Sequence, residues 1–185
     1  GSGKSTLMHL LAALDKPNEG EILINGQNIA KMKKRDLNKL RNRTFGFVFQ
    51  QFFMNPKDTV LQNVILPLKI GGVSLRKRKE IALKALEAVE LTDKAKNKAS
   101  NLSGGQKQRV CVARAIANSP EIIFADEPTG NLDSKTSKKI EDLLFGLNKD
   151  NGITLIIVTH DEALAQKCDR QIRIQDGQII SKGEK

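Results

Sequence analysis

Leu102-Ser103-Gly104-Gly105-Gln106 is the stretch around which the rest of the chain is organised. A serine can cap a helix with its hydroxyl, and the two glycines carry no Cβ that would keep a ligand away from the backbone. Val110, Ala113 and Ala117 follow at helical spacing. A helix that begins here would direct free N–H groups and the positive end of its dipole toward an anion. Alone, the stretch would be read as an ordinary capped helix after a loop. The phosphate-binding lysine motif upstream and the acidic strand end downstream favour an anion site instead.

The first residues contain a phosphate-binding motif. Gly1-Ser2-Gly3-Lys4-Ser5-Thr6 runs into a leucine-rich helix, and Gly3-Lys4-Ser5 supplies the end of the pattern G-x-x-x-x-G-K-[ST]. In such a loop the backbone N–H groups cradle the phosphates. Lys4 would reach the β- and γ-phosphates, and the Ser5 hydroxyl would bind Mg²⁺. We therefore expect nucleotide binding rather than a plain glycine-rich turn.

The first glycine of that pattern would fall three residues before Gly1. We expect the sequence to be a fragment cut inside the motif, without the strand that leads into the loop. Such a fragment should hold a nucleotide poorly by itself.

An acidic pair follows a predicted buried strand. Asp126 and Glu127 come after the apolar residues 122–125, and open α/β sheets bind their ligands at the carboxyl ends of strands. We expect Asp126 to hold Mg²⁺, directly or through water. Glu127 is expected to act as general base for the attacking water, while the metal and Lys4 stabilise charge on the transferred phosphoryl group. The alternative is a pair of solvated carboxylates.

Two further polar residues end apolar runs. His160 comes shortly after residues 153–158, a mostly apolar run that we predict to be a buried strand. We expect it to contact the γ-phosphate or the lytic water, although a histidine in this position is often structural. Gln50 follows a predicted strand at 45–49, where its amide could contact Mg²⁺ or water. His9 lies in the predicted helix after the phosphate loop and has no expected role.

The composition restricts the class of protein. Hydrophobic residues make up 39% of the chain and charged residues 28%, which is typical of a soluble globular protein, and no apolar run is long enough to span a membrane. The two cysteines, Cys111 and Cys168, match no metal spacing, so we expect small core residues in a reducing compartment.

The net charge of +10 leaves three readings open: a solvated surface, an anionic bilayer or nucleic acid. The basic residues gather at 31–43 and at Arg76-Lys77-Arg78-Lys79. Tyr and Trp are absent, so a platform for stacking bases would depend on Phe alone. Nucleic acid is therefore the least favoured partner.

Alternating strands and helices predict an α/β fold with a mostly parallel sheet and right-handed crossovers. Antiparallel hairpins are expected at residues 21–29, around an Asn-Gly turn, and at 171–181. Helices are expected at 59–70 and around residues 81–89, and Ser134 is expected to cap a further helix. The whole chain, 1–185, reads as one domain, with an α/β core at 1–50 and 119–185 and an inserted helical subdomain at 51–118.

Together these residues resemble the nucleotide-binding domain of ATP-binding-cassette (ABC) transporters, a family of P-loop ATPases. The matching motifs, in the family's order, are Gly3-Lys4-Ser5-Thr6, Gln50, Leu102-Ser103-Gly104-Gly105-Gln106, the run 122–127, Asn131-Leu132-Asp133 and His160. They cover essentially the whole chain. We refer below to residues 102–106 as the signature.

The resemblance implies an ATPase that works with ATP and Mg²⁺. It implies two such domains, here expected to form a homodimer, that bind ATP between the phosphate loop of one chain and the signature of the other, with Asp133 also at the nucleotide interface. Binding would close the dimer and hydrolysis would open it. The helical subdomain and Gln50 would pass this motion to a separate permease, with Phe52 and Phe53 as candidate contacts. The expected location is the cytoplasmic face of the cell membrane, as a peripheral subunit.

A finer resemblance is to the ATPases of lipoprotein-releasing, macrolide-export and antimicrobial-peptide-export permeases. It rests on residues 40–43, 46–51, 63–68 and 125–133. Three alternatives remain: an ABC-type ATPase in a non-transport membrane process such as cell division, a chromosome or DNA-repair ATPase, and a non-hydrolysing regulatory module. The second normally carries long coiled-coil insertions, and intact Glu127 and His160 argue against the third.

Overall fold

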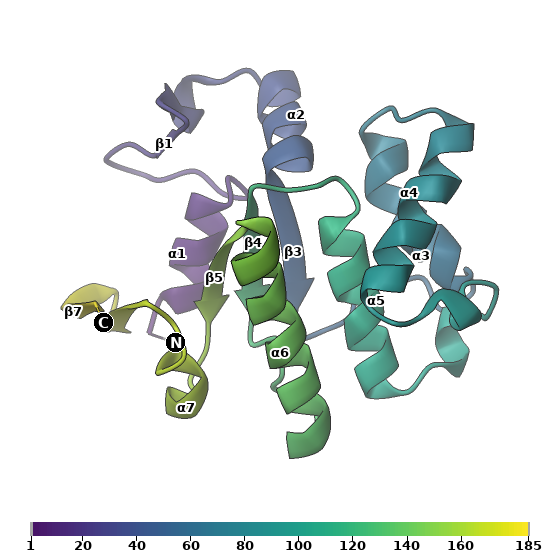
Figure 1. Ribbon diagram of the computed structural model, residues 1–185. Helices are drawn as coiled ribbons and strands as arrows, with labels where there is room; N and C mark the ends of the chain where they lie inside the picture. The colour runs from purple at the N-terminus through teal and green to yellow at the C-terminus, as the bar shows by residue number, and fades with distance from the viewer. Residues whose placement is uncertain (1, 185) are drawn as a thin grey trace.

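Three parallel strands form the central sheet, in the order β3-β4-β5. The computed structural model describes residues 2–184 of the chain (Figure 1). The strands of this sheet are β3 (Phe45–Phe49), β4 (Ile122–Asp126) and β5 (Thr154–Val158). The sheet with its flanking helices and two antiparallel hairpins confirms the predicted α/β architecture.

The register of the sheet aligns the ends of its strands. Phe49 lies opposite Asp126, and Asp126 lies opposite Val158. Because all three strands run in the same direction, the chain leaves them at one edge of the sheet. The next residues, Gln50 and Glu127 among them, are therefore brought together from distant parts of the sequence.

Helices cover both faces of the sheet (Figure 1). Their bounds are α1 (Lys4–Leu11), α2 (Lys34–Thr44), α3 (Val60–Ile70), α4 (Leu75–Ala88), α5 (Gly104–Ile116), α6 (Ser134–Asn151) and α7 (Glu162–Ala165). Short 3₁₀ helices are η1 (Ile29–Lys31), η2 (Thr92–Lys94) and η3 (Ala99–Asn101). The helices α3, α4 and α5 pack against one another, and α5 also packs against β3.

Alternating side chains of β4 build a core on each side of the sheet. Phe124 packs with Phe45 and with Met8 of α1 on one face. Ile123 and Ala125 face the other side, where they join a larger cluster formed by α3 to α6. Met8 thus packs α1 against one face of the sheet, and Ser5 in its first turn lies beside Asp126 at the carboxyl end of β4.

β5 is less buried than its sequence suggested. Leu155 to Val158 are half-buried and Thr154 is exposed, so the prediction of a buried strand was wrong for most of this run. In the described sheet β5 pairs with β4 alone, and a strand at the edge of a sheet keeps less of its surface covered.

Both predicted hairpins are present. β1 (Leu23–Ile24) and β2 (Gln27–Asn28) flank Asn25 and Gly26, whose φ angles of 50° and 76° fit a type I′ turn. β6 (Arg170–Gln175) pairs with β7 (Gln178–Glu184). Within residues 2–184, no helix is both long and apolar enough to cross a membrane.

The cap of α6 differs from the prediction. Asp133, not Ser134, is the N-cap, and its carboxylate accepts the backbone N–H of Thr136 at 3.0 Å. Ser134 is the first residue inside the helix. A carboxylate competes well with a hydroxyl for free N–H groups because its charge also interacts favourably with the helix dipole.

Candidate functional site

The carboxyl edge of the sheet opens into a polar cavity of about 370 Å³. The segment after β4, the segment after β5 and α6 contribute its walls. Its lining residues are Glu127, Thr129, Gly130, Leu132, Ser134, Ser137, Glu141, Thr159, His160 and Asp161. Two residues predicted to be catalytic, Glu127 and His160, therefore face the same cavity.

The phosphate loop meets β4 through Ser5. The Ser5 hydroxyl donates to Asp126 Oδ1 at 3.3 Å, although the two residues are 121 positions apart in sequence. Gly3 allows this approach because it precedes α1 with a φ of 88°, in the left-handed region that favours glycine. The hydroxyl and the carboxylate predicted to hold a metal are thus neighbours.

The other predicted residues of the loop lie close by. Lys4 is the first residue of α1, and its Nζ donates to the Ser2 hydroxyl at 2.7 Å. Thr6 is exposed in the first turn of α1. Gly1 lies outside the described residues. The loop and the first turn of α1 thus contain one lysine and three hydroxyl residues, Ser2, Ser5 and Thr6.

Both carboxylate oxygens of Glu127 are engaged. Oε1 lies 2.8 Å from His160 Nδ1, and Oε2 accepts a hydrogen bond from the Thr159 hydroxyl at 3.1 Å. Because a carboxylate only accepts, Nδ1 of His160 carries the proton in this contact. The Glu127 side chain is 20% exposed and that of His160 is 78% exposed. Glu127 has a φ of 44°, which is uncommon for a residue with a side chain. It directly follows the last residue of β4, and it lines the cavity.

Thr159 also belongs to the site, although the sequence did not predict it: its hydroxyl donates to Glu127 Oε2. Its Oγ1 accepts the backbone N–H of Asp161 at 3.0 Å, so its own proton is directed to Glu127. The Asp161 carboxylate in turn caps α7 by accepting from Ala163 and Leu164. The only available signal was its place between the apolar run and His160.

Gln50 makes its contacts away from Ser5 and Asp126. Its Nε2 donates to Asn131 Oδ1 at 3.2 Å, and Asn131 Nδ2 donates to the Gln50 carbonyl at 3.2 Å. Gly130 lies directly beside them: a Cβ there would lie 2.8 Å from Gln50 Nε2, so a larger residue would displace the Gln50 amide from this position. The structure thus joins Gln50 to the segment 130–133, and its predicted contact with a metal remains a prediction.

The signature forms the predicted helix start. The Ser103 hydroxyl accepts the N–H of Gln106 at 3.3 Å, and Gln106 Oε1 accepts the N–H of Ser103 at 3.0 Å, which is a capping box. Gly105 faces Thr136 at the start of α6, where a Cβ would lie 2.3 Å from the threonine methyl. Among the described residues, no hydrogen bond joins 103–106 to the phosphate loop of the same chain.

Asp133 is occupied by its own helix. Both of its carboxylate oxygens bind Thr136, one to the backbone N–H and one to the hydroxyl. These hydrogen bonds, that of the Thr136 side chain foremost, lower the pKa of Asp133 below its ordinary value. The Asp133 residue is exposed.

Gln108 connects α5 to the site and was not predicted. Its side chain is buried, and its Nε2 donates to two carbonyls: that of Phe49 at 3.2 Å and that of Pro128 at 2.6 Å. Gln50 follows the first carbonyl and Glu127 precedes the second. Gln108 Oε1 has no hydrogen-bond partner in the part of the chain that the structure describes. A buried glutamine in an amphipathic helix gives no sequence signal for such a bridge.

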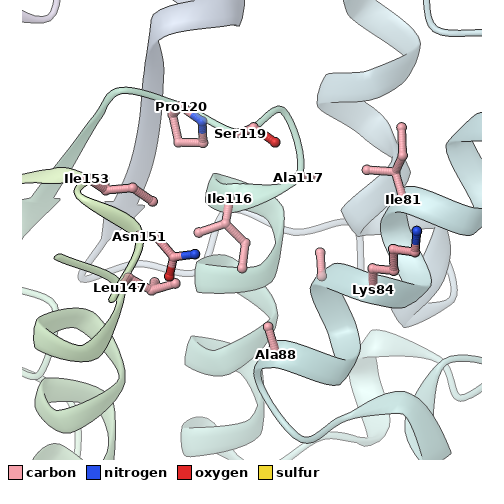
Figure 2. Close-up of a pocket in the computed structure, with 11 residues that line it drawn as sticks. Ile81, Lys84, Ala88, Ile116, Ala117, Ser119, Pro120, Leu147, Asn151 and Ile153 are labelled. Atoms are coloured by element: carbon pink, nitrogen blue, oxygen red, sulfur yellow. The ribbon is translucent and has the colours of Figure 1, made fainter. Parts of the chain in front are cut away.

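A second cavity, of about 500 Å³, lies near the opposite ends of the strands (Figure 2). It is lined by Ile81, Lys84, Ala85, Ala88, Ile116, Ala117, Ser119, Pro120, Leu147, Asn151 and Ile153. None of the predicted site residues is among them.

Within residues 2–184, no group of three or more His, Cys, Asp and Glu could hold a metal ion by itself. Burial raises the pKa of the Cys111 thiol to about 11, which makes it an unreactive core residue.

Comparisons with known proteins extend over nearly the whole chain. The ABC transporter family matches residues 1–130. The lipoprotein-releasing system ATP-binding protein LolD of Syntrophus aciditrophicus (strain SB) is 47% identical over 181 residues, 98% of this chain and 81% of that protein. The uncharacterized ABC transporter ATP-binding protein YknY of Bacillus subtilis (strain 168) is 45% identical over 180 residues, 97% of this chain and 78% of that protein.

Solved structures agree with the sequence relatives. The dimeric ATP-binding cassette MJ0796, in a post-hydrolysis state bound to ADP and Pi, superposes with a TM-score of 0.88 at 44% identity, over 99% of this chain and 81% of that one. The phosphate loop, the acidic strand end, the signature and the histidine thus occur in a fold of the same kind. The chain belongs to the ABC transporter family and is an ATP-binding, ATP-hydrolysing subunit of such a transporter.

Proposed function

We propose that hydrolysis takes place at the carboxyl edge of the sheet, with Glu127 as general base. The observation that carries this proposal is that two hydrogen-bonded pairs of residues meet there: Ser5 with Asp126, and Glu127 with His160. A base must lie within hydrogen-bond reach of the proton that it takes, and the remaining groups must stabilise the charge that develops on phosphate. Lys4 supplies a positive charge on the loop side of the site.

The residues present fit Mg²⁺ bound together with a nucleotide. Mg²⁺ usually takes one or two protein oxygens and completes its shell with water and substrate phosphates. Ser5 and Asp126 offer one hydroxyl and one carboxylate 3.3 Å apart, and Gln50 would be a third ligand after it leaves Asn131. When bound, the metal would neutralise phosphate charge.

The hydrogen bonds of Glu127 suggest which oxygen accepts the proton. Oε2 is held by Thr159, whose hydroxyl is fixed in turn by the backbone of Asp161. Oε1 is held by His160, whose side chain is largely exposed and free to turn. Oε1 would therefore become available to the attacking water when His160 turns toward the γ-phosphate, and the Thr159 hydrogen bond would keep the carboxylate in place.

We further propose that two chains assemble around ATP. The signature helix start of one chain would bind the γ-phosphate held by Lys4 of the other, because its N–H groups make no contact with its own loop. Ser103, Gly104, Gly105 and Gln106 would form this half of the site, with Asp133 beside it. The dimeric state of the cassette MJ0796 supports this arrangement.

The division of labour within the chain follows the packing. Residues 1–50 and 119–185 would form the nucleotide-binding core, and residues 51–118, with α3, α4 and α5 packed together, would contact a separate permease from the cytoplasmic face of the membrane. Phe53 is a candidate for this contact because it is largely exposed and Arg114 binds its carbonyl. Phe52 is half-buried, and Arg114 also binds its carbonyl.

Removal of the Lys4 ammonium tests the nucleotide site. Lys4→Ala should bind ATP more weakly than the parent chain in isothermal titration calorimetry, because the loop loses its side-chain cation toward the phosphates. Lys16→Ala, at an exposed lysine of the turn after α1, is the matched control and should bind as the parent does. Unaltered ATP affinity in Lys4→Ala would refute the placement of the phosphates.

A further inference from the structure

The excess of basic over acidic residues is concentrated in two segments of the chain. Residues 31–43 contain seven basic residues and one acidic residue, and residues 69–79 contain five basic residues and no acidic one. The chain has 31 basic and 21 acidic residues. Outside these two segments it has 19 basic and 20 acidic residues, so the rest of the chain is almost neutral. Clusters of basic residues of this kind interact favourably with anionic surfaces.

The fold brings these two segments together. Asn42, near the end of α2, donates to the Pro67 carbonyl of α3 at 3.0 Å. The turn between α3 and α4 also touches α2, since a Cβ on Gly71 would lie 2.5 Å from Asn42 Oδ1. Both α2 and α4 lie in the upper part of the view in Figure 1, whereas α7, which follows His160, lies at its lower edge. The two basic segments thus form one surface, away from the hydrolysis site.

The charges on this surface are not neutralised within the chain. In the described residues, no ion pair involves a basic side chain of 31–43 or 69–79, whereas Lys138 of α6 pairs with Asp142. Arg76, Lys77 and Lys79 also stand in the first turns of α4, where the helix dipole disfavours a positive charge. An external anion would compensate for this arrangement.

Large apolar side chains are exposed at the same turn. Leu66 is 49% exposed, Ile70 70% and Leu75 80%. Ile70 ends α3 and Leu75 begins α4, so both lie at the tip of this helical hairpin. We call the basic and apolar residues at this tip the hairpin patch: Leu66, Lys69, Ile70, Leu75, Arg76, Lys77 and Lys79.

We propose that the hairpin patch binds the surface of an anionic phospholipid bilayer. Basic side chains interact with lipid headgroups, and adjacent apolar side chains enter the boundary of the acyl chains. Nucleic acid would use the same charges, but it offers no partner for exposed aliphatic side chains, and the chain has no Tyr or Trp to stack on bases. The inference is independent of the catalytic roles proposed above.

Sedimentation with lipid vesicles tests the proposal. The parent chain should pellet with phosphatidylcholine vesicles that contain phosphatidylglycerol but not with phosphatidylcholine alone, and added salt should weaken the binding. The triple variant Arg76→Gln/Lys77→Gln/Lys79→Gln should bind about 100-fold more weakly, at roughly five-fold for each basic side chain. Ile70→Ser/Leu75→Ser should also weaken binding. Arg78 is left unchanged because its Nε binds the Val73 carbonyl.

A charge-matched control separates the patch from net charge. Lys135→Gln/Lys138→Gln/Lys139→Gln removes three exposed lysines from α6 and should bind vesicles as the parent does. Thermal unfolding and ATP hydrolysis should be unchanged in the Arg76→Gln/Lys77→Gln/Lys79→Gln variant. Equal loss in the control, or no vesicle binding by the parent, would overturn the proposal. Binding of a DNA duplex through the same residues in the absence of vesicle binding would assign the surface to nucleic acid instead.

Discussion

Replacement of Gln108 by methionine should loosen the two loops that flank the site. Methionine has a similar length and no donor, so the change removes the hydrogen bonds from Nε2 to the carbonyls of Phe49 and Pro128. These carbonyls adjoin Gln50 and Glu127. We expect the substitution to lower both the stability of the chain and its turnover, although Gln108 is far from Gln50 and Glu127 in the sequence.

The magnitude follows from the burial of the groups. Gln108 is 1% exposed, and a buried polar group that loses its partner costs about 1–3 kcal/mol. Two carbonyls lose their donor, and each loss is destabilising. The substitution also removes the unpaired Oε1 of Gln108, which offsets about the cost of one unsatisfied group. The net loss is therefore about 1–3 kcal/mol, which for a domain of this size lowers the Tm by roughly 2–10 °C.

Calorimetric unfolding and steady-state ATP hydrolysis measure the two effects. Gln178→Met makes the same chemical change at an exposed position of β7 and should leave both quantities unchanged. Gln108→Glu should be more harmful than Gln108→Met, because it turns a carboxylate toward two carbonyls in a buried position. A Tm for Gln108→Met within about 1 °C of the parent would refute the reasoning, since it corresponds to less than the cost of one buried group.

Thr159→Val should lower kcat by about 10–100-fold, because a hydrogen bond to a charged group contributes about 1.5–3 kcal/mol. KM should change little, since this hydrogen bond holds Glu127 rather than the nucleotide. Thr159→Ser should restore most of the rate, and a kcat of Thr159→Val equal to that of the parent would contradict the role of the hydroxyl. Gly105→Ala should destabilise the chain by about 1–3 kcal/mol, since its Cβ would meet the Thr136 methyl. The double variant with Thr136→Ser, which keeps the hydroxyl on Asp133, should recover much of that loss, and strict additivity in denaturant unfolding would show that the two residues do not interact.

Local patterns in the sequence predicted the frame of the site well. The apolar runs before Gln50, Glu127 and His160 are characteristic of strands, and parallel strands must deliver their following residues to one edge. The cap by the Ser103 hydroxyl was predicted from the residue type alone, whereas the reciprocal hydrogen bond from the Ser103 N–H to Gln106 was not predicted. These features are local, or they follow from the rule that all strands of a parallel sheet end on the same side.

Contacts between side chains from distant segments could not be predicted in the same way. The pairing of Gln50 with Asn131 and the bridge made by Gln108 depend on how the loops pack after the sheet has formed. The half-buried state of β5 depends on its place in the sheet rather than on its composition. Asp133 displaced Ser134 as the cap of α6 because both residue types suit that position and only the backbone geometry separates them.

Turnover by Glu127→Gln tests the central claim most directly. The substitution keeps the shape of the side chain and its contact with Thr159, but it removes the carboxylate that would accept the proton of the attacking water. We predict that the variant binds ATP, accumulates as a closed dimer in gel filtration with ATP, and loses steady-state hydrolysis, whereas Glu87→Gln on the exposed face of α4 behaves as the parent. Hydrolysis by Glu127→Gln near the parent rate would contradict the assignment of Glu127 as the general base.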